Sequence, residues 1–116
     1  MQLTLLKAKI HRAVVTGADL NYEGSIGIDP HLLEQAGIKQ WEKVDIYNIT
    51  NGNRFSTYAI HGAKGEVSLN GAAARLVHKD DLIIIAAYAA YTEEEAENHK
   101  PTILLMNNDN TIKEIL

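Results

Sequence analysis

Several stretches of the chain alternate between apolar and polar residues in the way that β-strands do. The first covers residues 3–15, where Lys7, Lys9 and His11 follow one another at every second position. Side chains two residues apart point to the same face of a strand, so this stretch predicts a strand with basic groups on one face. Burying three basic groups unpaired is costly, and we expect this face to be solvated or paired.

A hairpin is predicted further along. Residues 43–50 and 54–60 are rich in strand-forming residues and flank Asn51-Gly52. Asn-Gly is the strongest short-range signal for a tight β-hairpin, because both residues tolerate a positive φ. Additional short strands are predicted at residues 66–69, 82–88, 102–106 and 111–115.

Helix signals are short and local. Asp29 followed by Pro30, with Gly37 seven residues after the proline, indicates a short helix with an N-cap and a terminating glycine. Thr92 and Glu95 form a capping-box pattern for a second helix, which we expect to run to about residue 99. A glycine turn at residues 70–71 opens into helix-forming alanines. Many short strands with a few small helices favour a mainly β fold, in particular a small β-barrel.

Length and hydrophobicity indicate one domain that does not enter a membrane. The chain has 116 residues, of which 46% are hydrophobic, and this is enough for a single core. The longest apolar run, residues 82–91, is about half of what a membrane-spanning helix needs. Lysines interrupt the apolar stretches near the N-terminus, so no signal peptide is predicted and we expect a cytoplasmic protein.

Charge and cysteine content narrow the chemistry. There are 11 basic and 15 acidic residues, for a net charge of −4, with no basic run, so we expect no nucleic-acid partner. The absence of cysteine excludes thiolate catalysis and cysteine-ligated metals. The five histidines are isolated from one another, and we expect no metal site. Small-molecule chemistry and protein assembly remain as the classes of function to consider.

Three short clusters are candidates for function. They are Tyr22-Glu23-Gly24-Ser25, residues 51–58 and Asn70-Gly71-Ala72-Ala73-Ala74. Each of them alone is more often an ordinary turn or helix start. Nucleotide-binding loops, zinc-protease motifs and nucleophile elbows are missing from the chain.

Together and in this order, the clusters resemble the pyruvoyl-dependent aspartate 1-decarboxylase family. The resemblance covers nearly the entire chain and also includes Lys9-Ile10-His11-Arg12 and Ala18-Asp19-Leu20. It implies a six-stranded double-psi β-barrel with small helices. It also implies a homotetramer whose active sites lie between adjacent subunits.

The same resemblance implies that the chain is a proenzyme. It would cleave itself between Gly24 and Ser25 into a β chain (1–24) and an α chain (25–116), and Ser25 would become a covalent pyruvoyl cofactor. Neither a metal nor pyridoxal phosphate would then be needed. Thr57 matches the threonine that helps to polarise the carbonyl at the cleavage point. The sequence leaves open whether cleavage is spontaneous or needs a maturation factor.

The implied activity is decarboxylation of L-aspartate to β-alanine and CO₂, which would supply pantothenate and coenzyme A synthesis. The substrate would form a Schiff base with the pyruvoyl group, which accepts the electrons that the departing carboxylate leaves behind. Tyr58 matches the proton donor, and Arg54 matches a residue that binds a substrate carboxylate. The substrate-binding residues implied in this way are Lys9, His11, Arg54, Thr57, Asn70, Gly71, Ala72 and Ala73.

Strand geometry adds one condition to this set of residues. Arg54 and Tyr58 point to one side of a regular strand, whereas Thr57 points to the other. Either a bulge intervenes, or Thr57 acts on the cleavage point from another subunit or strand face. The chain also departs from the family pattern: Tyr47 stands where some members have tryptophan, Gly27 where threonine is familiar, and the loop at residues 61–67 is short.

Two alternatives differ in measurable ways. A β-barrel that binds a ligand or a protein and never processes itself would keep Gly24-Ser25 as a plain turn in an intact chain. A pyruvoyl decarboxylase of another acidic amino acid, such as glutamate, would be processed but would prefer a different substrate.

Overall fold

The computed structural model describes residues 1–116, and it confirms a mainly β fold with small helices. The strands and helices, in chain order, are β1 (Gln2–Val14), β2 (Gly17–Asp19), β3 (Ser25–Ile28), α1 (Pro30–Ala36), β4 (Lys43–Asn48), β5 (Arg54–His61), β6 (Val67–Asn70), the 3₁₀ helix η1 (Gly71–Leu76), β7 (Leu82–Thr92), α2 (Glu93–Glu97), β8 (Thr102–Met106) and β9 (Ile112–Ile115).

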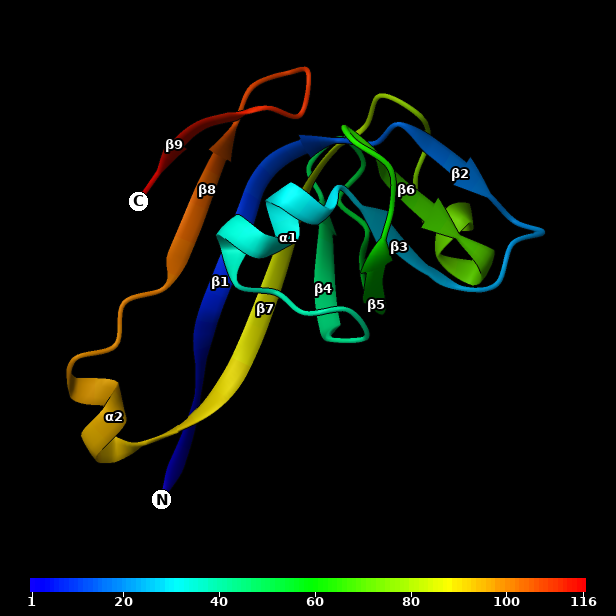
Figure 1. Cartoon of the computed structure of the whole chain (residues 1–116). Helices are drawn as coiled ribbons and strands as arrows, with labels where there is room; N and C mark the ends of the chain where they lie inside the picture. Colours follow the sequence, from blue (N-terminus) through cyan, green and yellow to red (C-terminus); the bar gives the residue numbers. More distant parts are fainter.

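All nine strands belong to one sheet, in the order β2-β6-β3-β5-β4-β7-β1-β8-β9. The sheet curls back on itself, because β2 follows β1 along the chain but pairs with β6 at the far end of the order (Figure 1). In the link from β1 to β2, the Thr16 N–H donates to the carbonyl of Val67, the first residue of β6, at 2.8 Å. The double-psi barrel of six strands stays a prediction.

The longest ladder joins β1 to β7 and forms an arm that carries the N-terminus and α2 at its tip (Figure 1). The predicted capping box begins α2: Thr92 Oγ1 accepts from the Glu95 N–H at 3.1 Å, and Glu95 Oε1 accepts from the Thr92 N–H at 2.8 Å. At β1 the ladder has a bulge near Lys7, whose ammonium pairs with the Glu42 carboxylate at 2.7 Å. The expected pairing of a basic group on this strand is therefore found at Lys7.

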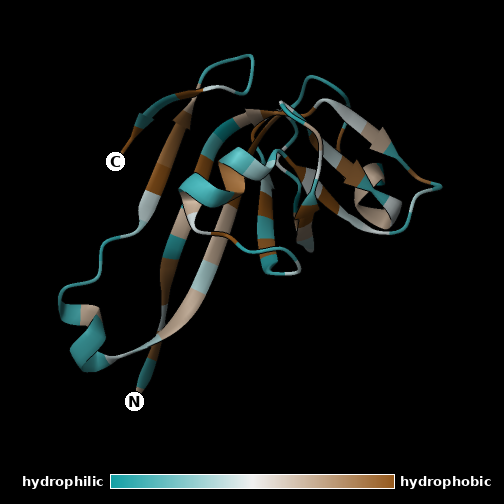
Figure 2. Cartoon of the chain, in the orientation of Figure 1, coloured by the Kyte–Doolittle hydropathy of each residue, from teal (hydrophilic) through white to brown (hydrophobic).

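Alternating side chains of the central strands build the core. Ile10 of β1, Ile46 of β4, and Ile83 and Ile85 of β7 are fully buried. Figure 2 shows apolar residues concentrated in these strands, while α2 and the turns are hydrophilic. The helix α1 has the predicted ends, since Asp29 Oδ1 accepts from the His31 N–H at 2.9 Å and Gly37 has a φ of +75°.

Two strands were not predicted from the pattern, and one of them is central to the site. The strand β3 (Ser25–Ile28) lies between β5, to which it is parallel, and β6, to which it is antiparallel. All four of its residues are buried. It is too short for a periodic signal, and its hydrogen-bond partners come from segments more than 30 residues away. No helix of the structure has the length and apolar character that crossing a membrane would require.

Candidate active site

Ser25 begins β3 in an unusual backbone conformation. Its φ is +141°, and its exposed fraction is only 1%. A positive φ is uncommon outside glycine and costs on the order of 1–3 kcal/mol, so it persists only where surrounding contacts impose it. Asn70 is the antiparallel partner of Ser25, and its Nδ2 donates to Ser25 Oγ at 3.3 Å. The serine hydroxyl is therefore held at a strained, buried position.

A cavity of about 280 Å³ opens on this serine. This volume is just below the roughly 300–1,000 Å³ typical of ligand pockets, which suits a small substrate. Six predicted site residues line it: Gly24, Ser25, Thr57, Asn70, Ala72 and Ala73. Phe55, Ser56 and Leu76 complete the wall.

Gly71, also predicted, is packed against the backbone at the cleavage point. Its φ is +65°, and a Cβ added there would lie 2.8 Å from Gly24 Cα and 2.9 Å from Gly24 N. No side chain fits at such distances from main-chain atoms, so only glycine allows η1 to begin this close to Gly24.

Tyr58 reaches the same bond from the opposite face of β5. Its hydroxyl donates to the Gly24 carbonyl oxygen at 2.8 Å. The segment from Arg54 to Tyr58 pairs with β4 without a register break, so no bulge is present and Thr57 faces the cavity from the other side of the strand. The Gly24 carbonyl thus accepts its side-chain hydrogen bond from Tyr58 rather than from Thr57.

The remaining predicted residues, Lys9, His11 and Arg54, do not line this cavity, although Arg54 lines an adjoining pocket that shares Phe55 and Ser56 with it. Arg54 is in register with Tyr47, Tyr47 with Ile84, and Ile84 with His11, which forms one row across β5, β4, β7 and β1. Lys9 belongs to the neighbouring row, which runs through Ala86 and Asp45 to Ser56. We call the surface formed by these two rows the outer face.

Lys9 and His11 do not share the cavity of Ser25 within one chain. Neither residue is among those that line the cavity, and β1 is not a neighbour of β3 in the sheet. Two groups of predicted residues therefore exist, one around Gly24 and Ser25 and the other on the outer face.

Arg54 is fixed by an aromatic pair on the outer face. Its guanidinium carbon lies 4.0 Å from the centre of the Tyr47 ring, which is a cation–π contact. The Tyr47 hydroxyl is 2.8 Å from the Tyr88 hydroxyl. This hydrogen bond, together with burial, raises the pKa of Tyr47 to about 12. The Tyr47 hydroxyl is therefore uncharged at pH 7, and its ring contacts the Arg54 guanidinium.

His11 is the other perturbed group on the outer face. Burial, followed by the charges of Lys9 and Arg12, lowers the pKa of His11 from its ordinary value of 6.5. Its Nδ1 atom is buried without a hydrogen-bond partner. The ring is therefore neutral at pH 7, and the positive charge in this region comes from the lysine and the arginine.

Three site features were missed from the sequence. Tyr88 lies in a continuous apolar run that does not reveal which face it occupies, and Trp41 packs against Tyr58 from a turn without any typical turn residue. Gly27 is also closely approached, since a Cβ there would lie 2.7 Å from Glu66 Oε2 and 3.0 Å from Ser68 Oγ, and these side chains would have to move to admit a larger residue. No signal in the chain pointed to this close approach.

No group of three or more His, Cys, Asp or Glu side chains is placed so that it could hold a metal ion. A covalent group made from Ser25 would be held by the residues of the cavity, where the Asn70 amide lies within hydrogen-bond distance of the Ser25 side chain. Such a group would consist of the backbone and side-chain atoms of position 25, so it fits where the serine already lies.

The fold and the cavity define a small mainly β protein whose polar side chains converge on one backbone bond, Gly24–Ser25. The family model described as Aspartate decarboxylase matches residues 1–113, and the chain belongs to this family.

Similar proteins span nearly the same length. The aspartate 1-decarboxylase of Herminiimonas arsenicoxydans is 59% identical, covering 95% of this chain and 94% of the relative. That of Hydrogenobaculum sp. is 57% identical, covering 99% and 92%. That of Bdellovibrio bacteriovorus is 55% identical, covering 98% and 92%. The predicted membership of this enzyme family is confirmed.

Proposed function

We propose that this chain is a proenzyme that cleaves itself between Gly24 and Ser25 and then decarboxylates L-aspartate to β-alanine and CO₂. The observation that carries the proposal is the convergence of Tyr58 and Asn70 on the two sides of the Gly24–Ser25 bond. Relatives named aspartate 1-decarboxylase, more than half identical over the length of the chain, support the choice of substrate.

The proposed cleavage starts at Ser25. Its Oγ attacks the Gly24 carbonyl carbon, and the C–N bond breaks to give an ester and a free amine at position 25. Elimination then removes the Gly24 carboxylate and leaves dehydroalanine, and water converts this to a ketone with release of ammonia. The strained φ of +141° favours the reaction, because breaking the bond releases the strain. Asn70 holds the hydroxyl in place.

A pyruvoyl group at position 25 would supply a ketone that binds the amino group of the substrate and accepts the electron pair freed by the departing CO₂. Asn70 lies within reach of that ketone. The backbone at Ala72 and Ala73 lines the same cavity and can contact the substrate. Tyr58, whose hydroxyl already lies at the Gly24 carbonyl, is the proton donor once Gly24 has separated.

The outer face would bind the substrate carboxylates. Lys9 and Arg54 provide positive charge for a dicarboxylic acid, and a guanidinium can donate two parallel hydrogen bonds to a carboxylate. Because neither Lys9 nor His11 lines the Ser25 cavity of its own chain, these two residues would act on the Ser25 cavity of an adjacent subunit. This supports the homotetramer with active sites between subunits. The product would feed pantothenate and coenzyme A synthesis in the cytoplasm.

Release of CO₂ and formation of β-alanine test the proposal. The wild-type chain is expected to act on L-aspartate and only weakly on L-glutamate, while Ser25→Ala stays intact and inactive. Tyr58→Phe is expected to be cleaved but to lose most turnover. Decarboxylation by Ser25→Ala would contradict the pyruvoyl mechanism, and equal rates on the two amino acids would contradict the substrate. If the wild-type chain is inactive, the assay should be repeated after incubation with cell extract, which supplies any maturation factor.

A further inference from the structure

Trp41, the single tryptophan of the chain, occupies a position that disfavours it. It lies in the turn from Lys39 to Glu42, which is closed by the Glu42 N–H on the Lys39 carbonyl at 3.1 Å. Its φ is +75°, and its side chain is 67% exposed. Turns that need a positive φ favour glycine or asparagine, and a left-handed conformation costs other residues about 1–2 kcal/mol. Core packing does not explain an exposed indole held at this cost.

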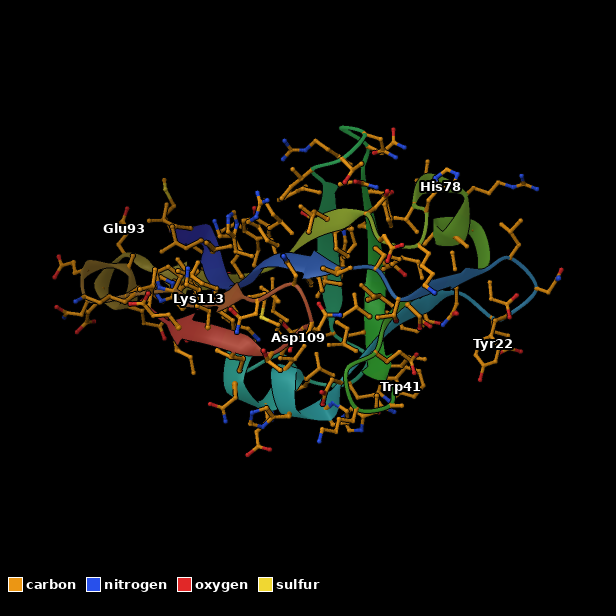
Figure 3. The ribbon with its side chains drawn as sticks, turned by 90° about the horizontal axis from the view of Figure 1, so that it is seen from above. Tyr22, Trp41, His78, Glu93, Asp109 and Lys113 are labelled. Carbon is orange, nitrogen blue, oxygen red and sulfur yellow. The ribbon has the colours of Figure 1, made fainter.

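The indole packs instead against Tyr58. The two ring centres are 6.0 Å apart, with the planes at 34°. Such a separation lies within the range in which aromatic pairs attract one another. Figure 3 shows Trp41 beside β5, the strand that carries Tyr58. It is the only aromatic ring in contact with Tyr58 within the chain.

Backbone hydrogen bonds join this turn to Ala59 of β5, the residue that follows Tyr58. The Trp41 N–H donates to the Ala59 carbonyl at 2.7 Å, and the Ala59 N–H donates to the Glu42 carbonyl at 3.0 Å. The Glu42 carboxylate in turn pairs with Lys7 of β1. The backbone of Trp41 is thus held firmly, and this sets where the indole lies relative to the phenol.

Tyr58 needs such support. Its side chain is 37% exposed on the outer face, while its hydroxyl reaches around to the Gly24 carbonyl at 2.8 Å. Cleavage of the Gly24–Ser25 bond would remove this carbonyl from its fixed place. A proton donor must stay within hydrogen-bond reach of the reacting atom, so a second contact is required after cleavage.

We propose that Trp41 is a positioning residue for Tyr58, its indole holding the phenol ring so that the hydroxyl stays directed at position 25. This inference rests on the proposed function, in which Tyr58 is the proton donor.

Two substitutions test it. Trp41→Asn removes the ring and suits the positive φ, whereas Trp41→Phe keeps a ring against Tyr58. Gln40→Ala, in the same turn, is the matched control for disturbance of the turn itself. Each purified variant would be examined for self-cleavage by mass, for melting temperature, and for kcat and KM with L-aspartate.

We expect Trp41→Asn to be cleaved, to melt at the same or a higher temperature, and to lose about tenfold in kcat with KM changed less than twofold, because a misplaced acid slows proton transfer without weakening binding. Trp41→Phe should recover most of the kcat, and Gln40→Ala should behave as wild type. A wild-type kcat in Trp41→Asn would overturn the inference, as would a marked fall in its melting temperature or an effect confined to KM. If the wild-type chain neither cleaves nor decarboxylates, with or without cell extract, the proposed function itself fails.

Tryptophan fluorescence tests the contact separately. Since Trp41 is the single tryptophan, all tryptophan emission of the chain comes from the indole that packs against Tyr58. Tyr58→Ala should shift the emission to longer wavelength, because the indole becomes more exposed, while Tyr58→Phe should leave it unchanged. Identical spectra for Tyr58→Ala and the wild-type chain would contradict the contact.

Discussion

Replacement of Gly71 by alanine gives the sharpest test of how the cleavage point is packed. The new Cβ would lie 2.8 Å from Gly24 Cα, 2.9 Å from Gly24 N and 3.2 Å from the Tyr22 carbonyl oxygen. All three are main-chain atoms, which cannot move aside as the end of a flexible side chain does. The 20–24 loop must therefore shift, and with it the Gly24 carbonyl.

The cost has two parts. A left-handed alanine costs about 1–2 kcal/mol at a φ of +65°, and overpacking against fixed atoms adds typically about 1–3 kcal/mol. Gly52→Ala separates the two, because Gly52 has a φ of +81° with nothing within 4 Å of its Cβ. We expect Gly52→Ala to lose about 1–2 kcal/mol and Gly71→Ala about 2–5 kcal/mol.

Urea unfolding in the Ser25→Ala background measures this difference on chains that all stay intact. In the Ser25 background, mass analysis over time measures cleavage, which we expect Gly71→Ala to slow strongly and Gly52→Ala to leave unchanged. If Gly71→Ala unfolds like Gly52→Ala and is cleaved at the wild-type rate, the close packing of η1 on Gly24 does not exist in solution.

Three further predictions concern other parts of the molecule. Arg54→Lys should raise KM for L-aspartate about tenfold, because a lysine cannot make the bidentate contact, while cleavage measured by mass is unchanged; an unaltered KM would remove Arg54 from the binding site. The pKa of His11 is lower in the native chain than its ordinary value of 6.5. As the pH drops below 6.5, the unfolded chain therefore binds a proton at His11 before the native chain does, and stability falls. In urea titrations from pH 7 to about pH 5, His11→Gln should show a weaker loss than wild type, and equal slopes would refute the shift. Asn110→Leu should cost roughly 2–4 kcal/mol in urea unfolding, because its buried amide pairs with both the N–H and the carbonyl of Val14; a loss below 1 kcal/mol would contradict this role.

Local signals in the sequence predicted much of the fold. The helix between Asp29 and Gly37, the capping box at Thr92 and the hairpin around Asn51-Gly52 are all present, because each depends on a few neighbouring residues. The strand β3 could not be predicted in this way. Its place between β5 and β6 depends on partners far along the chain, and only the complete sheet determines it.

The same limit applies to the site. The resemblance supplied the residues, but their division into a cavity around Ser25 and an outer face with Lys9, His11 and Arg54 comes from the strand order. Regular alternation correctly placed Thr57 and Tyr58 on opposite faces of β5. That both residues lie at the same bond depends on where the chain places Gly24 and Ser25 beside β5, which no local pattern encodes.

Breaking of the Gly24–Ser25 bond and conversion of Ser25 into the cofactor both change the mass of the chain. Intact-mass analysis of purified, denatured protein can therefore detect both. We expect two species, one ending at Gly24 and one covering 25–116, whose first residue has the mass of a pyruvoyl group and lacks a free amine. A single chain of full mass that persists after warming and after incubation with cell extract would contradict the proposed cleavage.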